Sequence, residues 1–186
     1  MTRVLRFTTV SLAALMVSAC AALPDDAPVL EQLDPETGAT VTRLGHPIEL
    51  YRETFVKDAT GRFAFVAPFE TNQMGNRELF LWVAAPLESP ADAAPPTVEV
   101  DGAVLNLGAP GRAADFAGLK QSPYKIPTPW SSMYYYKVDA GIMATLTGAH
   151  DLTVRVAEST KDGVVRTRFA TQVGADSALR EFAARQ

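Results

Sequence analysis

Proline and glycine interrupt this chain at short intervals and so limit how long any regular element can be. The 186 residues include 13 prolines and 12 glycines, which are spread between short apolar runs. Short runs bounded by such turn formers are typical of β-strands, whereas long helices avoid both residues in their interiors. The sequence therefore predicts many short strands rather than long helices.

Two neighbouring runs in the middle of the chain predict a hairpin. Residues 62–69 and 77–85 are rich in apolar side chains, and residues 70–76 between them are rich in turn formers. The second run is apolar almost throughout, which is typical of a strand buried on both faces. We therefore expect these two strands to pair across the turn.

A second hairpin is predicted around Asp101-Gly102. This pair separates the alternating runs 97–100 and 103–107. Asp-Gly suits a type I′ turn, because both central residues of that turn need positive φ. Since Glu99 makes one face of the hairpin polar, we expect that face to meet water.

The rest of the chain adds further strands and two helices. Strands are expected over 40–44, 47–56, 132–138, 152–156 and 165–171. Asp139 is a suitable N-cap for a short helix over 140–147, and a C-terminal helix would bury Leu179 and Phe182. We expect a mainly β fold: an antiparallel β-sandwich, immunoglobulin-like in its general architecture, with one short inserted helix and a C-terminal helix.

The N-terminus has the features of a secretory signal peptide. Arg3 and Arg6 precede an apolar run over 7–17, which is too short to span a bilayer as a helix. The following segment, Val17-Ser18-Ala19-Cys20, resembles the lipobox of bacterial lipoproteins, in which small residues precede the cysteine that receives the lipid.

This resemblance implies that Cys20 is lipidated. The signal peptide would be cut between Ala19 and Cys20, and the Cys20 sulfur would carry a diacylglycerol that anchors the protein on a membrane. Cys20 is the only cysteine, so no disulfide can form within one chain. Ala21 stands where lipoproteins of the inner membrane tend to have aspartate, which implies the periplasmic face of the outer membrane.

These features divide the chain into three parts. Residues 1–19 are the expected signal peptide, 20–37 a lipidated flexible tether, and 38–186 a single β-sandwich domain. The expected tether contains several acids that we predict to be solvated, because no dry pocket would surround them there: Asp25, Asp26, Asp34 and Glu36.

The charge balance disfavours nucleic acid as a partner. The full chain has a formal charge of −4, and removal of Arg3 and Arg6 with the signal peptide leaves −6. Binding to phosphates requires clustered Lys and Arg side chains. We therefore expect no nucleic-acid partner.

Few residues suggest catalysis or a metal site. A zinc site needs three or four ligands, but His46 and His150 are the only histidines. Ser131-Ser132 lacks the surrounding motif of a serine hydrolase, and no glycine-rich phosphate loop is present. The sequence predicts neither a cofactor nor a metal, and a hydrolase with an unrecognised site is left as an alternative.

An aromatic cluster near a long irregular segment is the remaining candidate site. Long loops such as 108–131 are often functional, although a structural crossover is the alternative. Prolines around Tyr124 predict that Tyr124 and Lys125 lie on a stiff, exposed loop. Trp130 and Tyr134 complete the candidate binding residues, and the alternative is that Trp130, Tyr134 and Tyr136 fill the core.

The sequence thus predicts a membrane-anchored envelope lipoprotein that is not an enzyme. We expect it to bind another envelope component, either a protein or a glycan, through residues 108–136. A structural or assembly accessory of the outer membrane is the alternative from another class. The oligomeric state is left open.

Overall fold

The computed structural model describes residues 28–53, 61–86, 94–125, 128, 131–160, 163–171 and 175–185. The expected signal peptide, Cys20 and the other tether residues before Pro28 lie outside the described residues, as does Trp130. The elements are β1 (Val29–Leu33), β2 (Thr40–Leu44), β3 (Ile48–Arg52), β4 (Phe63–Gln73), β5 (Asn76–Pro86), β6 (Thr97–Val100), β7 (Ala103–Val104), the 3-10 helix η1 (Ala114–Ala117), β8 (Ser131–Val138), α1 (Ala140–Thr147), β9 (Leu152–Thr160), β10 (Gly163–Ala170) and α2 (Ala175–Ala184).

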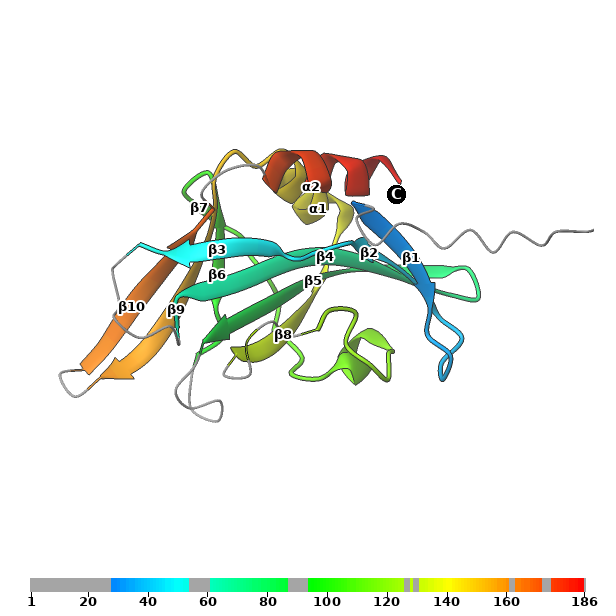
Figure 1. Ribbon diagram of the computed structural model, residues 1–186, viewed down its shortest axis with the longest axis horizontal. Helices are drawn as coiled ribbons and strands as arrows, with labels where there is room; N and C mark the ends of the chain where they lie inside the picture. Colours follow the sequence, from blue (N-terminus) through cyan, green and yellow to red (C-terminus); the bar gives the residue numbers. More distant parts are fainter. Residues whose placement is uncertain are drawn as a thin grey trace, which may run out of the picture.

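All of these strands belong to one antiparallel sheet, with a short inserted helix and a C-terminal helix (Figure 1). The prediction of a mainly β, sandwich-like fold is therefore confirmed. The strand order is β1-β2-β4-β3-β10-β9-β6-β7, and β5 and β8 continue the sheet beyond the other edge of β4. Strands β2 and β3 share one edge of β4, each pairing with about half of it.

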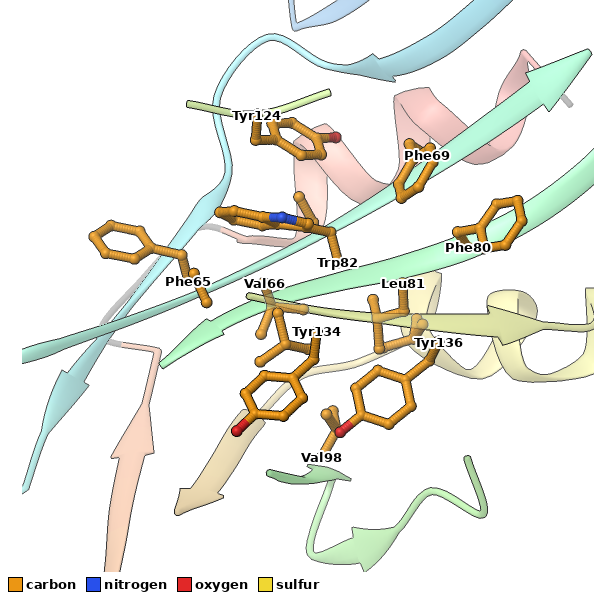
Figure 2. Close-up of a cluster of buried hydrophobic side chains, with 14 of the residues drawn as sticks. Phe65, Val66, Phe69, Phe80, Leu81, Trp82, Val98, Tyr124, Tyr134 and Tyr136 are labelled. Carbon is orange, nitrogen blue, oxygen red and sulfur yellow. The ribbon is translucent and has the colours of Figure 1, made fainter. Parts of the chain in front are cut away.

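Most of β4 and β5 and the middle of β8 are buried on both faces, as Figure 2 shows. Alternation along the strands sends Phe69, Phe80 and Trp82 to one face, and Leu81 and Tyr134 to the other. All five side chains are fully buried. The predicted hairpin is confirmed, and its strands are longer than expected because the polar residues around the turn also pair.

The far end of the sheet folds back over β8. The Tyr136 hydroxyl donates a hydrogen bond of 2.8 Å to the carbonyl of Pro96, the residue before β6. Val98 of β6 lies close to Tyr136 in Figure 2. Strand β6 therefore faces β8, although the order of the sheet separates the two strands widely, and this gives the fold its two layers.

Both helices are confirmed. The Asp139 side chain caps α1 by accepting a hydrogen bond of 2.8 Å from a backbone N–H in the first turn. Met143 and Leu146 of α1 are buried, as are Leu179 and Phe182 of α2, and the two helices pack against each other on one side of the sheet (Figure 1). No helix in the described ranges is long and apolar enough to cross a bilayer.

The flexible tether predicted to end at residue 37 is too long. Residues Val29–Leu33 form β1, which pairs with β2 along its whole length. The short apolar pair that begins β1 gives little local signal, and pairing with β2 is what orders it. Asp34, which was expected to be solvated, is buried at the end of this strand.

The turn at Asp101-Gly102 is confirmed, with φ values of 50° and 81°. The Asp101 carboxylate also accepts hydrogen bonds from the N–H groups of His150 and Asp151, at 3.0 and 2.8 Å. The face of the hairpin that was expected to meet water does so at Val104, which lies opposite Glu99 and is 61% exposed. Glu99 itself is buried, because β9 lies beside β6 and its Arg155 covers the carboxylate with a hydrogen bond of 2.5 Å.

Candidate functional site

Tyr124 lies in the core, so the prediction that it is exposed is wrong. Only 2% of the residue is exposed, and its ring packs against Trp82 with the centroids 5.1 Å apart. The hydroxyl accepts a hydrogen bond from the Leu44 N–H (3.0 Å) and donates one to the Pro68 carbonyl (2.7 Å). Burial raises the pKa of Tyr124, although the Leu44 N–H and the Arg43 guanidinium lower it. Through its hydroxyl, Tyr124 therefore connects its own loop to the end of β2 and to β4.

The other candidate residues are dispersed. Tyr134 is fully buried, as the alternative of a core role predicts, and the Arg112 guanidinium lies 4.3 Å from the centroid of its ring. Lys125 is exposed, and Trp130 lies outside the described residues. The described members of this set therefore form no common surface.

The irregular segment that carries Tyr124 closes the open edge of β8. Gly111 and Tyr135 exchange two backbone hydrogen bonds of 2.9 Å, and Leu119 is buried. The Lys120 N–H donates to the Asp34 carboxylate at 3.1 Å, which ties the segment to the end of β1. This part of the long loop is a structural crossover, the alternative that the sequence left open.

The candidate residues for metal binding or hydrolysis do not form a common site in the described part of the chain. His46 and His150 are both exposed. Within the described residues no group of three or more His, Cys, Asp or Glu side chains could hold a metal ion. The Ser131 hydroxyl lies 2.6 Å from that of Thr128, so its partner there is another hydroxyl.

Two adjoining cavities that share lining residues lie beside β7; we call them together the β7 groove and each of them an arm. Its apolar arm has a volume of about 540 Å³. The buried side chains of Val98 and Tyr136 line this arm together with the half-buried Leu105, Leu107 and Pro110. Residues 108–110 and Tyr136 belong to the region that the sequence predicted to bind a partner.

The second arm, the arginine arm, has a volume of about 260 Å³ and lies against β6, β9 and β10. Ala157 is directly opposite Arg166 in the register of β9 and β10, and Arg155 lies two residues before Ala157 on the same face. The small Ala157 side chain leaves room between the two longer arginines. Arg155 pairs with the buried Glu99, whereas Arg166 has no acidic partner in the described part of the chain.

The two arms meet at three shared residues, Pro95, Thr97 and Val104. Val104 is 61% exposed, although it is a large apolar residue in a strand. The Leu105 N–H donates a hydrogen bond of 2.9 Å to the Val98 carbonyl. Because backbone groups alternate in direction along a strand, the N–H and C=O of Val104 point away from β6, toward the open edge of the sheet.

Sequence reasoning did not find the arginine arm, because its residues lie far apart in the chain. The only local signals were the alternation of Arg166 and Arg168 along a predicted strand and the apolar run after Asp101-Gly102. Neither signal shows that Val104 stays exposed or that Arg155 and Arg166 flank Ala157, since both facts depend on pairing between strands.

No protein-family model matches this chain, and no curated protein or solved structure is similar enough to give a match. The features that bear on function are therefore the geometry of the β7 groove and the N-terminal motif.

Proposed function

We propose that this protein is a lipid-anchored lipoprotein on the periplasmic face of the outer membrane. In this proposal its β-domain binds another envelope component in the β7 groove and catalyses no reaction. The observation that carries the proposal is Val104, an exposed apolar side chain at the junction of the two arms and on an edge strand.

An exposed apolar residue within a groove is a feature of interaction sites, because water contact with apolar surface is relieved when a partner covers it. Single exposed apolar residues are common on protein surfaces and need no partner. Val104 differs from those because half-buried apolar residues, Leu105 and Leu107, continue the same surface into the apolar arm.

The anchor is supported by the segment Val17-Ser18-Ala19-Cys20, which resembles a lipobox, and by the basic and apolar residues before it. Intact mass of membrane-fractionated protein tests this part, with wild type measured beside Cys20→Ser. We expect a mature N-terminus at Cys20 with acyl mass in the wild type only. Cleavage at another position without acyl mass would refute the anchor.

The groove is tested by a photo-crosslinking residue placed at Val104 in living cells. The matched control is the same residue at Met74, which is fully exposed in the turn between β4 and β5. We expect one discrete adduct from position 104 that is absent from position 74, and its partner should bind the purified protein with an affinity that Val104→Asp abolishes. Equal labelling at both positions would refute the site.

The same experiment distinguishes binding in the β7 groove from the alternative, a structural or assembly accessory of the outer membrane. In that case position 104 gives no adduct and Val104→Asp has no phenotype, whereas Cys20→Ser alone reproduces the loss of the gene. That outcome would mean that the anchored domain is sufficient for function and that the β7 groove has no role in it.

A further inference from the structure

Resting on the proposed function, we infer the chemistry of the groove's occupant. The occupant is an extended peptide segment of a partner protein, in which one acidic side chain is followed closely by apolar side chains. The carboxylate lies in the arginine arm above Ala157, and the apolar side chains cross Val104 into the apolar arm.

The charges on the outer face of the sheet favour an acidic group. Arg155 and Arg168 are directly opposite each other in the register, and like charges in such positions repel unless they are compensated. Both have acidic partners: Glu99 for Arg155, and Asp151 with Glu53 for Arg168.

Arg166 lies on the same face but has no acidic partner among the described residues. It lines the arginine arm together with Ala157, whose small side chain leaves space for a carboxylate beside Arg166. A partner's carboxylate at this point would supply the missing charge, and its bond to a guanidinium would be of the charge-assisted type. Because the chain as a whole has a formal charge of −4, this cationic arm is a local exception rather than part of a general basic surface.

The shape of the groove favours an extended chain over a compact ligand. The arms lie on the two faces of the β6–β7 hairpin, since Thr97 and Glu99 point to one face and Val98 to the other. An occupant that enters both arms must therefore pass the edge at Val104, where outward backbone groups can accept and donate hydrogen bonds. An extended peptide has the backbone groups to meet them, and a lipid chain has none.

The test uses blocked peptides, acetylated and amidated, with one aspartate followed one to three positions later by two leucines. Identical peptides with asparagine are the control. Binding is measured by NMR titration of the purified protein, with the backbone signals of Thr97, Val104 and Ala157 as reporters. We expect aspartate peptides to bind about three- to tenfold more tightly than asparagine peptides at low salt, and the difference to shrink as salt screens the exposed guanidinium.

Arg166→Gln should remove this preference for aspartate. Arg180→Gln is the matched control, because Arg180 is an exposed arginine on α2, outside the groove. Val104→Ser should weaken aspartate and asparagine peptides equally. Equal binding of both peptides to the wild type, or equal effects of the two arginine substitutions, would overturn the inference. If no peptide binds but position 104 still crosslinks in cells, the peptide inference fails while the proposed function stands.

Discussion

Residues 104–110 and residues 111–125 follow one another in the chain, but only the second segment is fixed into the core. Residues 111–125 are held by the Gly111 bridge to β8, by the Lys120 bond to Asp34 and by the two hydrogen bonds of Tyr124. In residues 104–110 no side chain is fully buried, and Val104 is 61% exposed.

This difference shows that length and irregularity do not identify a functional loop. A long segment can close a sheet edge when its polar groups find partners and its apolar groups are buried. What marks residues 104–110 is apolar surface that the fold leaves uncovered. We therefore expect residues 111–125, the anchored segment, to contribute stability and residues 104–110, the groove segment, to contribute binding.

The largest effect is expected from Tyr124→Ala. Removal of a buried aromatic ring should lower the free energy of unfolding by about 3–5 kcal/mol, because the ring's packing against Trp82 is lost and a cavity remains. Urea denaturation monitored by tryptophan fluorescence measures this loss. Tyr124→Phe keeps the ring but strands the Leu44 N–H and the Pro68 carbonyl, and should cost about 1–3 kcal/mol. A change below 1 kcal/mol in Tyr124→Ala would contradict the core role.

Asp34→Asn should have the next largest effect. Burial raises the pKa of Asp34, but hydrogen bonds from the backbone N–H groups of Lys120, Glu36 and Thr37 outweigh it and leave the pKa below its ordinary value. The Glu36 and Thr37 N–H groups use one carboxylate oxygen and the Lys120 N–H uses the other, whereas an amide keeps only one oxygen and turns an NH2 group toward the remaining donor. We therefore expect a loss of about 1.5–3 kcal/mol at neutral pH.

The pH dependence of this effect has a defined direction. Because the folded pKa is lowered, the stabilisation by the Asp34 carboxylate is present above the pKa of the unfolded chain and is lost as pH falls through the folded value. The stability of the wild type should therefore approach that of Asp34→Asn below about pH 4. Denaturation curves between pH 3 and pH 7 are the measurement, and a constant difference over this whole range would contradict the prediction.

Gly111→Ala should destabilise the anchored segment more mildly. A Cβ atom at Gly111 would lie 2.2 Å from Cγ and 2.3 Å from Cβ of Phe116, so Phe116 must shift. Overpacking of this kind costs about 1–3 kcal/mol, and a change of rotamer does not relieve it, because Cβ of Phe116 is bonded directly to the backbone. Gly108→Ala is the control, since a Cβ atom there has no neighbour within 4 Å. Thermal unfolding should separate the two variants, and equal melting temperatures would count against the bridge as a tight contact.

The contrast between the two segments also explains which features could be predicted from the sequence: those that depend on residues close together in the chain. The β4–β5 hairpin, the Asp101-Gly102 turn and the Asp139 cap depend on residues close in the chain, and all three were predicted. Tyr124 was misplaced because its hydrogen-bond partners Leu44 and Pro68 lie 80 and 56 residues away. The arginine arm was missed for the same physical reason, because the pairing of β9 with β10 creates it.

The smallest effect on stability is expected from Val104→Ser, and this is the change that separates the segments most clearly. Because Val104 is 61% exposed, its substitution should alter the free energy of unfolding by less than about 0.5 kcal/mol. If Val104 is a contact residue of the groove, the same substitution weakens capture of the envelope partner, because loss of buried apolar surface at an interface costs affinity. Tyr124→Phe should show the opposite pattern, with reduced stability and unchanged capture at temperatures where it stays folded. If Val104→Ser instead destabilised the fold as much as Tyr124→Phe, Val104 would belong to the structural framework, and the distinction between an anchored segment and a binding segment would be lost.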